Sequence, residues 1–406
     1  MTQSRLRFGT FIPPHTPPEE HPALVLEEDM DRVVLLDKLG YEEAWVGEHH
    51  SGGWEITASP ELFIASVAQR TQQIRLGTGV SSLPYHHPYM LADRIRQLDY
   101  HTRGRVMFGV GPGSLPSDSH MMGLDTSKAR DQMDEAIDPL VRLLNGKTVT
   151  QKTDWFELND AKLQYVSYNE RGVEMAVASQ VSPAGATAAG KHGLGLLSIG
   201  ATSAGGFNAL SSNWGIAEET AAEHGHAMDR SRWRLVGPVH VAETREKARE
   251  NVQFGLSRWI DYMTKVAALP LAPPPGADPI DHMISTGFAV IGTPDDFVAQ
   301  MERLREQSGG FGCFLILDTH WADWAATRRS YELIARYAIP KINQLNRNRF
   351  ASEQWLRENN DDFKGQLTSA VRAKMQEHAQ TRGDEKLSPD LVEYFDAGDE
   401  KKASGG

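Results

Sequence analysis

The stretch EAWVGEHH, residues 43–50, contains the two features that decide the fold of this chain. It begins with an apolar run, Ala44-Trp45-Val46, and then passes through one glycine to a carboxylate and two adjacent histidines. A run that is apolar without alternation is typical of a strand buried on both faces of a parallel sheet. The polar residues that follow it therefore mark the carboxyl end of a buried strand.

The same pattern recurs along the sequence. Short apolar runs alternate with amphipathic segments that have the apolar spacing of helices. Eight such units within roughly 335 residues favour an α/β fold, the TIM (β/α)8 barrel. A doubly wound parallel sheet is the alternative, although such sheets usually have about five to seven strands. The runs are LRFGTFI (6–12), EAWVG (43–47), IRLGTGV (74–80), RVMFGVG (105–111), EMAVAS (174–179), GLLSIG (195–200), WRLVGPVHV (233–241) and GCFLIL (312–317).

Two long connections interrupt this alternation, one at residues 112–173 and the other at residues 242–311. The second contains LPLAPPPGADP, residues 269–279, whose prolines disfavour a regular helix or strand. Long insertions in a barrel usually shape or cover the face that carries the active site. We therefore expect insertions at the C-terminal face, and we expect residues 260–290 to be mobile until a ligand binds.

A change of pattern near residue 345 predicts a second region. We assign residues 1–345 to the barrel and residues 346–406 to a helical extension. Apolar residues at four-residue spacing in the extension form a stripe that should dock on the barrel or on a second subunit. The final segment, DEKKASGG, should be disordered. The stripe consists of Phe363, Leu367, Val371 and Met375.

Composition restricts the class of protein. Among 406 residues there are 42 Lys and Arg against 54 Asp and Glu, a net charge of −12, so a nucleic acid would be repelled. The N-terminus has no signal-peptide pattern, and no run of ~18 apolar residues could span a membrane. The single cysteine, Cys313, cannot form an intrachain disulfide, which suits a reducing compartment. These features predict a cytoplasmic protein.

Three interpretations of Glu48, His49 and His50 compete: a metal site, acid–base groups over an organic cofactor, or polar residues that cap a strand. The predicted strand ends are rich in small, neutral groups, and their carboxylates are Glu48 and Asp318. This scarcity argues against a metal centre, which usually recruits several His and Asp or Glu ligands from separate strands. Adjacent residues of an extended chain also point to opposite sides, so two neighbouring histidines rarely chelate one ion.

Glycines at three strand ends allow the backbone to approach a flat or phosphorylated ligand closely, although each could also be an ordinary tight turn. The segment GVGPGS, residues 109–114, superficially resembles a dinucleotide loop but lacks the full G-x-G-x-x-G pattern. A phosphate could instead lie at residues 180–182, where SPAGATAAGKHG predicts the start of a helix.

Taken together, the strand ends resemble those of the bacterial luciferase-like flavin-dependent monooxygenase superfamily. The resemblance covers about residues 5–345 in order. Two further segments, GWEITASPELFIA and GPGSLPSDSHMMG, are most similar to limonene 1,2-monooxygenase-like members. The motifs that carry the resemblance are RFGTF (7–11), GYEEAWVGEHH (40–50), IRLGTGVSSLPYHHP (74–88), LDYHTRGRVMFGVGPG (98–113) and VASQVSP (177–183).

The resemblance implies a TIM barrel that binds reduced FMN, with FAD as the alternative flavin. It also implies a cis peptide bond between Gly79 and Val80 behind the flavin ring. One departure is Pro112, which stands where luciferase has an arginine that holds the phosphate. We therefore expect reduced FMN to bind better than oxidised FMN. The cofactor-binding residues that the resemblance implies are Thr78, Gly79, Val80, Gly111, Ser179, Gln180, Val181 and Ser182.

His49 and His50 are the candidate catalytic residues. In the family the first histidine of E-H-H is a catalytic group near the flavin, which here is His49. Because side chains alternate, we expect His50 to point toward the barrel wall on the same side as Glu48. An unperturbed imidazole titrates near neutral pH, so His49 could hold or remove a proton during oxygen transfer.

The resemblance implies a two-component monooxygenase. Reduced FMN and O2 would form a C4a-(hydro)peroxyflavin that oxygenates a small hydrophobic substrate, such as a terpene or a ketone. We expect a separate NAD(P)H:flavin reductase as a partner and a homodimer as the assembly. His320 and Trp321 are assigned to the substrate pocket, and Trp321 and Trp324 could form an apolar lid. The alternatives are a flavin- or deazaflavin-dependent dehydrogenase or reductase of the same fold, and a flavin-binding barrel without turnover.

Overall fold

The computed structural model describes residues 5–382, except residues 14, 181, 201, 204–208, 268 and 270. The chain divides into two compact units, Met1–Asn343 and Gln344–Gly406. No helix among the described residues is both long enough and apolar enough to cross a bilayer.

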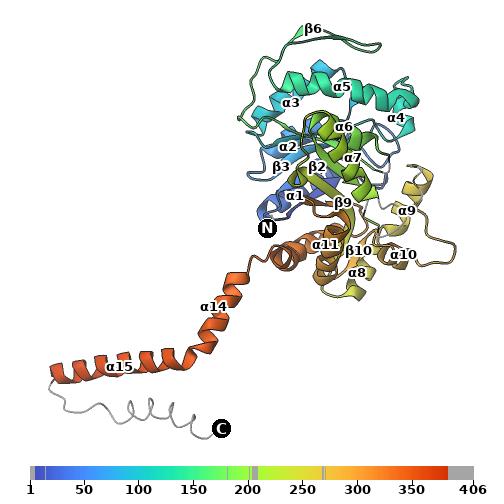
Figure 1. The fold of residues 1–406 in the computed structure, drawn as a ribbon. Coiled ribbons are helices and arrows are strands. Elements are labelled where there is room, and N and C mark those ends of the chain that lie inside the picture. The colour runs from blue at the N-terminus through green and yellow to red at the C-terminus, as the bar shows by residue number, and fades with distance from the viewer. Residues whose placement is uncertain are drawn as a thin grey trace. The chain divides into compact units, whose positions relative to one another are not determined.

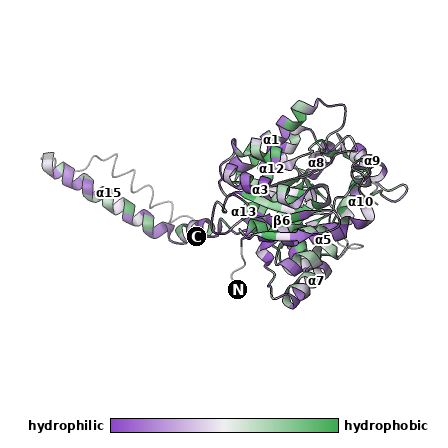
Figure 2. Ribbon diagram, turned by 90° about the horizontal axis from the view of Figure 1, so that it is seen from above, coloured by the Kyte–Doolittle hydropathy of each residue, from purple (hydrophilic) through white to green (hydrophobic). Residues whose placement is uncertain are grey.

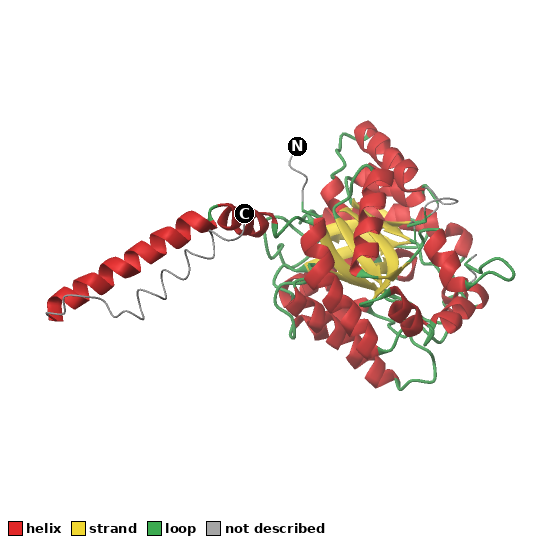
Figure 3. Cartoon of the chain, turned by 90° about the horizontal axis from the view of Figure 1, so that it is seen from below, coloured by secondary structure: helices red, strands yellow, loops and turns green. Residues whose placement is uncertain are grey.

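Eight parallel strands of the first unit close into a barrel (Figure 3). Each strand pairs with the next, and the last strand pairs with both its predecessor and the first, which leaves no open edge. The predicted TIM barrel is therefore confirmed, and the eight apolar runs are its strands. These are β1 (Arg7–Ile12), β2 (Glu43–Val46), β3 (Arg75–Ser82), β4 (Val106–Gly111), β7 (Glu174–Ser179), β8 (Gly195–Ile199), β9 (Trp233–Val241) and β11 (Cys313–Leu317).

Helices surround the strands, and each has a buried apolar face and an outer polar face, so both colours run along them in Figure 2. Between β11 and the end of the unit, a helical segment continues through a π-helical turn at Ile334–Ala338 into α13 (Ile339–Ile342). The barrel helices are α1 (Pro22–Leu39), α2 (Pro60–Ala68), α3 (Pro88–His101), α5 (Ala129–Leu144), α6 (Ala184–His192), α7 (Ala209–Glu223), α11 (Pro294–Ser308) and α12 (Trp324–Leu333).

Local sequence sets where several of these helices begin and end. The Ser59 hydroxyl accepts a hydrogen bond from the Leu62 amide at the start of α2. Thr293 and Asp296 form a capping box at the start of α11, as the TPDD sequence predicts. Gly40 ends α1 in the left-handed conformation, with φ 82°. Such caps each stabilise a helix by about 1 kcal/mol, and they fix where the following strand or loop begins.

Charged side chains close the amino-terminal end of the barrel interior. The Arg234 guanidinium lies 2.9 Å from the Glu43 carboxylate and 2.6 Å from that of Glu174. Arg75 lies 2.7 Å from Glu174, and Arg7 lies 3.2 Å from Glu43. Because every carboxylate in this group has an arginine partner, the charges can be buried, although such a group adds little net stability.

The indole of Trp45 fills the barrel above these charges. The guanidinium of Arg234 lies 5.3 Å from the ring centroid. A Cβ atom on Gly77 would lie 2.5 Å from the indole, and one on Gly109 would lie 2.9 Å from it, so these glycines provide the space that it occupies. Cys313 is buried in the same cluster. A ligand can therefore enter the barrel from the carboxyl ends of the strands, because the other end is filled.

The first insertion divides into two parts with different positions. Residues 112–128 follow β4 at the C-terminal face and include α4 (Pro116–Met121) and a 3-10 turn, Thr126–Lys128. After α5, the antiparallel hairpin of β5 (Val149–Lys152) and β6 (Glu157–Ala161) packs outside α3 and α5 (Figure 1). Phe156 of the hairpin contacts the ring of His87 at the start of α3. The hairpin lies outside the helices because its apolar residues join the outer core and not the barrel interior.

The second insertion covers the C-terminal face. It contains α8 (Arg245–Val252), α9 (Leu256–Lys265), α10 (Pro279–Ser285) and β10 (Val290–Gly292), which extends the pairing of β9. Trp259 and Tyr262 of α9 are buried and belong to the same apolar cluster as Phe11 and Trp45 inside the barrel. We call α9 with these two side chains the α9 cover. The mobility predicted for residues 260–290 stays a prediction.

The second unit contains two helices, α14 (Arg347–Glu358) and α15 (Asn360–Arg382). Phe363 of the predicted stripe contacts Trp355, with ring centroids 5.1 Å apart, and Leu367 is 67% exposed. The predicted docking of the stripe stays a prediction. The segment DEKKASGG lies outside the described residues.

Candidate active site at the carboxyl ends of the strands

The loop after β2 brings a carboxylate back to His49. Gly52 and Gly53 have φ values of 85° and 77°, a conformation that favours glycine, and they reverse the chain. The His49 amide donates a hydrogen bond to the Thr57 carbonyl at 3.2 Å. Glu55 also forms an isolated β-bridge with His15 in the loop after β1. The glycine pair therefore places Glu55 beside the histidine that precedes it by six positions.

Both ring nitrogens of His49 face carboxylates. Nε2 lies 2.9 Å from Glu55 Oε2, and Nδ1 lies 3.1 Å from Asp118 Oδ2. Burial alone would lower the pKa of His49, but the charges and hydrogen bonds of Glu55 and Asp118 outweigh it and raise the pKa to about 10. An unperturbed imidazole titrates near neutral pH, and the two carboxylates account for the departure of His49 from that value. His49 is an imidazolium across the neutral range, with a proton on each nitrogen.

Asp118 of α4 holds three consecutive residues of the His49 loop. Its Oδ2 faces the His49 ring, and its Oδ1 accepts hydrogen bonds from the His50 amide at 3.2 Å and from the Ser51 hydroxyl. These bonds keep the pKa of Asp118 below its ordinary value despite burial, so it stays ionised. Sequence reasoning did not single out Asp118, because the segment GPGSLPSDSHMMG that contains it served only to support the family resemblance.

Glu48 joins the loop after β2 to the loop after β3. The His86 ring lies 2.7 Å and the His50 ring 3.2 Å from Glu48 Oε1, and the Ser82 amide donates to Oε2 at 2.6 Å. The prediction that His50 lies on the same side as Glu48 is confirmed. The His50 ring also contacts the ring of Tyr85. His50 therefore takes part in a contact between loops, while His49 lies in a separate charged group.

The predicted cis peptide bond between Gly79 and Val80 is present. The Thr78 hydroxyl donates to the Gly109 carbonyl at 2.8 Å and accepts from the Gly109 amide at 3.0 Å. This hydroxyl is thus used between β3 and β4, and Thr78 itself is buried and paired with Val46 on one side and Phe108 on the other. Gly111 lies beside Val80, where an added Cβ would be 2.6 Å from a Val80 methyl. The structure therefore brings Gly79, Val80 and Gly111 together.

The residues predicted to hold the phosphate do not all face the same place. Ser179 is buried, and its hydroxyl accepts a hydrogen bond from Asn213 of α7 at 3.1 Å. Gln180 is exposed. The Ser182 hydroxyl accepts from the Ala184 amide at 3.3 Å at the start of α6, whose first turn has no acidic residue. Val181 lies outside the described residues. Ser179 is thus turned toward α7, whereas Ser182 lies at a helix start that suits an anion.

His320 and Trp321 face different neighbours. The His320 ring lies 3.0 Å from Glu20 Oε1, whereas Trp321 is buried edge-on against Trp259, with ring centroids 5.3 Å apart. Trp321 therefore contributes to the region beneath the α9 cover. Trp324 does not share this region, because it packs against the guanidinium of Arg32.

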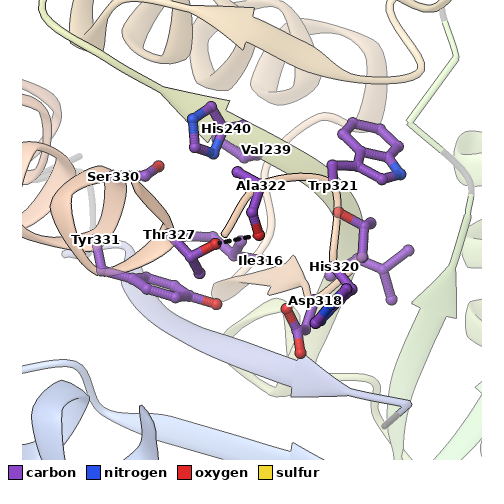
Figure 4. A pocket seen from close by; sticks show the side chains of 12 residues that line it. Val239, His240, Ile316, Asp318, His320, Trp321, Ala322, Thr327, Ser330 and Tyr331 are labelled. Atoms are coloured by element: carbon purple, nitrogen blue, oxygen red, sulfur yellow. Dashed lines mark hydrogen bonds between the residues drawn. The ribbon is translucent and has the colours of Figure 1, made fainter. Parts of the chain in front are cut away.

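A pocket between β9, β11 and α12 includes both His320 and Trp321 (Figure 4). The Thr327 hydroxyl of α12 donates to the Ala322 carbonyl there at 3.2 Å, and the Trp321 indole is directed away from Tyr331. Because α12 supplies Thr327, Ser330 and Tyr331, this pocket lies between the strands and a surrounding helix, and not in the barrel mouth.

Comparison with known proteins identifies the relationship of the chain. The profile of the luciferase-like monooxygenase family matches residues 6–310. The chain belongs to this family. It is 48% identical over 339 residues to a limonene 1,2-monooxygenase from Rhodococcus erythropolis, which covers 84% of this chain and 87% of that protein. It is 43% identical to a 4-hydroxyprotoasukamycin monooxygenase from Streptomyces nodosus subsp. asukaensis, covering 87% and 97% of the two chains.

A solved structure shows the same fold. The oxygenating constituent of 3,6-diketocamphane monooxygenase from Pseudomonas putida, a type II Baeyer-Villiger monooxygenase in complex with FMN, has a TM-score of 0.70. It is 25% identical to this chain and covers 83% of this chain and 99% of its own. Like its relatives, this luciferase-like protein is a flavin-dependent oxidoreductase.

The strand ends of this luciferase-like barrel fit a flavin in two respects. Buried polar atoms without a partner, the Ser81 and Thr57 hydroxyls and the Trp321 indole nitrogen, lie in loops or strand ends at this face and could bind a polar ring edge. Val80 and the neighbouring glycines offer an apolar surface for a flat ring. Among the described residues, no His, Cys, Asp and Glu side chains are grouped so that three of them could hold a metal ion.

Proposed function

We propose that this protein uses reduced FMN and O2 to oxygenate a small hydrophobic substrate of the terpenoid class. The observation that carries the proposal is the partly buried His49 cation, held between Glu55 and Asp118 beside the apolar α9 cover. The proposal is supported by the relatives, whose names specify limonene and diketocamphane as compounds that they oxygenate. Both compounds are small, hydrophobic terpenoids.

When bound, the reduced flavin supplies the two electrons that activate O2. The residues of the chain then have three tasks. His49 is held as a cation between Glu55 and Asp118 at neutral pH, so its charge can stabilise negative charge on a nearby oxygen, and it can pass on a proton once one of these two hydrogen bonds breaks. Trp259, Tyr262 and Trp321 exclude water with their buried rings. Gly79, Val80 and Gly111 would form the surface behind the ring.

The remaining assignments concern partners and assembly. The loop after β4 leads into α4, a helix of six residues, and not into the long helix of a dinucleotide motif. This supports a separate NAD(P)H:flavin reductase as the source of reduced flavin. A homodimer is supported by two exposed apolar side chains on neighbouring helices, Leu62 of α2 at 73% and Met90 of α3 at 52%. A single buried cysteine, Cys313, suits the cytoplasm.

The test is an oxygen-uptake assay with photoreduced FMN and a panel of terpenes, ketones and terpene alcohols, with products identified by mass spectrometry. Incorporation of one ¹⁸O atom from ¹⁸O2 into a terpenoid is the expected result. Anaerobic oxidation of an alcohol, with electrons passed to a flavin or a deazaflavin, would instead identify a dehydrogenase. Tight binding of oxidised flavin with no substrate consumed would identify a binding protein without turnover.

A further inference from the structure

Glu55 is a buried carboxylate with partners on both oxygens. Oε2 faces Nε2 of His49 at 2.9 Å, and Oε1 accepts a hydrogen bond from the Tyr262 hydroxyl at 2.8 Å. The His15 ring lies 3.6 Å from the same Oε1. Glu55 thus contacts the loop after β1, the loop after β2 and the α9 cover. No requirement of the fold explains why a carboxylate should join these three segments.

The backbone fixes Glu55 independently of its side-chain partners. Its β-bridge with His15 is reinforced by a hydrogen bond from the Thr16 amide to the Trp54 carbonyl at 3.2 Å. Trp259 of α9 donates from its indole to Nδ1 of His15 at 3.2 Å, which places the proton of neutral His15 on Nε2, facing Glu55. The Asp318 carbonyl, 3.3 Å from the same Nδ1, receives no proton in that tautomer.

Tyr262 sits against the loop that carries Glu55. Its ring stacks on Trp54 with centroids 4.8 Å apart and planes 20° apart. The hydroxyl lies 3.1 Å from where a Cβ of Gly52 would be, so a larger residue at that position would push Tyr262 away. At its start, α9 is held by the Gly255 amide, which donates to the Trp321 carbonyl at 2.9 Å.

We propose that Glu55 is a positioning residue that orients the His49 ring and, through Tyr262, ties that orientation to the closed position of the α9 cover. This inference rests on the proposed function, because it assigns His49 a role in the oxygenation. When α9 is closed, both Glu55 oxygens are occupied and its carboxylate cannot rotate away from His49. When α9 opens, Oε1 loses the Tyr262 hydroxyl and keeps only the more distant His15 ring, so the Glu55 carboxylate is held less firmly against His49.

The charge on His49 depends on the groups that face it. These are Glu55 from the loop after β2, Asp118 from α4, and the neighbouring His50, whose charge opposes that of His49. Tyr262 and His15 contact Glu55 and not His49, so they affect the His49 charge only through Glu55. Glu55→Gln removes one of the two flanking charges but keeps the size of the side chain and an oxygen that can accept a hydrogen bond.

The first measurement is an NMR titration of the His49 ring in the full chain labelled with ¹³C and ¹⁵N histidine, without flavin. In the natural protein His49 should stay doubly protonated across neutral pH. In Glu55→Gln its titration should move down into the neutral range. Glu157→Gln, on the exposed β6 hairpin, is the matched control and should leave the titration unchanged. An unchanged His49 titration in Glu55→Gln would overturn the proposal.

The second measurement uses Tyr262→Phe, which keeps the ring on Trp54 and removes only the hydroxyl. Hydrogen exchange across residues 256–265 should become faster, and the ratio of product to H2O2 should fall by about threefold or more. Tyr165→Phe, an exposed tyrosine, is the control. Unchanged exchange and unchanged product ratio would rule out the link to α9. Because the NMR and exchange experiments need no turnover, an absence of product in the natural protein would refute the proposed function and not the role of Glu55.

Discussion

The two ends of the barrel both bury charged groups, but they use different chemistry. At the amino-terminal end the cations are arginines, and Arg234 binds Glu43 with two nitrogens, at 2.9 and 3.0 Å. At the carboxyl-terminal end the cation is His49, with carboxylates at 2.9 and 3.1 Å. An arginine stays charged at every accessible pH, whereas a histidine can lose a proton.

The difference shows which end can change its charge state. Burial raises the pKa of Glu174, but Arg234 and Arg75 outweigh it and lower the pKa to about 2. Glu174 therefore stays ionised across the neutral range. At the other end the pKa of His49 is about 10, and that value depends on Glu55 and Asp118 staying in place. The charges at the amino-terminal end are structural and constant. At the carboxyl-terminal end, the protonation of His49 depends on the loops that carry Glu55 and Asp118.

The largest effect is expected from breaking the amino-terminal group. Arg234→Met should lower the free energy of unfolding by about 3–5 kcal/mol, because Glu43 and Glu174 would be left buried and without their main partner. Urea denaturation measures this loss. Arg328→Met, in an exposed pair with Glu332, is the control and should change stability by less than about 1 kcal/mol. Equal stability of the two variants would show that the amino-terminal charges are not structural.

Breaking the carboxyl-terminal group should affect turnover more than folding. His49→Ala should lower product formation by ~10²-fold, the usual scale for loss of a positioned proton-transfer group, while H2O2 release rises. His50→Ala should mainly lower stability, because it removes one partner of Glu48. Flavin affinity, product and H2O2 are measured for both. If only His50→Ala releases more H2O2, His50 is the catalytic histidine.

A smaller effect is expected from a change of one pH unit. The folded His49 has a raised pKa, so the stability it contributes is complete below pH ~6.5 and is lost as the pH rises toward 10. In this window the folded protein binds more protons than the unfolded chain, and the slope is at most about 1.4 kcal/mol per pH unit for one proton. Urea denaturation at several pH values should show this decline, and Glu55→Gln should reduce it. A flat profile in the natural protein would contradict the assigned charge.

The smallest effect on turnover is expected from removing the second unit, which contains none of the residues described above at either end of the barrel interior. Truncation after Asn343 removes the unit Gln344–Gly406. Flavin binding and some activity should remain, whereas thermal stability or oligomeric state should change, because the helical stripe would lose its docking role. Calorimetry and size-exclusion chromatography measure the two properties. Loss of flavin binding in a folded truncated protein would assign a part of the site to the extension.

Local sequence patterns predicted the strands and the part of the site that contains Glu48 and His50. Continuous apolar runs predicted the barrel, and the alternation of side chains predicted that His50 would share a side with Glu48. Asp118 was not predicted, because its contact with His49 joins residues 69 positions apart and depends on how two loops fold. The position of Glu55 beside His49 depends on the chain reversal at Gly52 and Gly53. The sequence shows the glycine pair, but it does not show in which direction the chain turns there.

The position of the insertions was predicted only in part for a similar reason. The hairpin of β5 and β6 lies in a connection that length alone assigned to the C-terminal face, but its apolar residues fit the outer surfaces of α3 and α5. Thr78 was assigned to the cofactor site on its position in a motif, and its hydroxyl instead bonds across to Gly109. Position along a strand can be read from the sequence, but the partner of a side chain across the sheet cannot.

Cys313 is buried in the barrel interior, so its chemical reactivity reports how often the sheet opens. The thiol is fully buried, and burial raises its pKa well above the ordinary value, so it is a poor nucleophile in the closed barrel. A thiol-reactive dye can modify it only when strands separate. Since Cys313 is the single cysteine of the chain, the rate of labelling reports one event at one place, without an engineered probe.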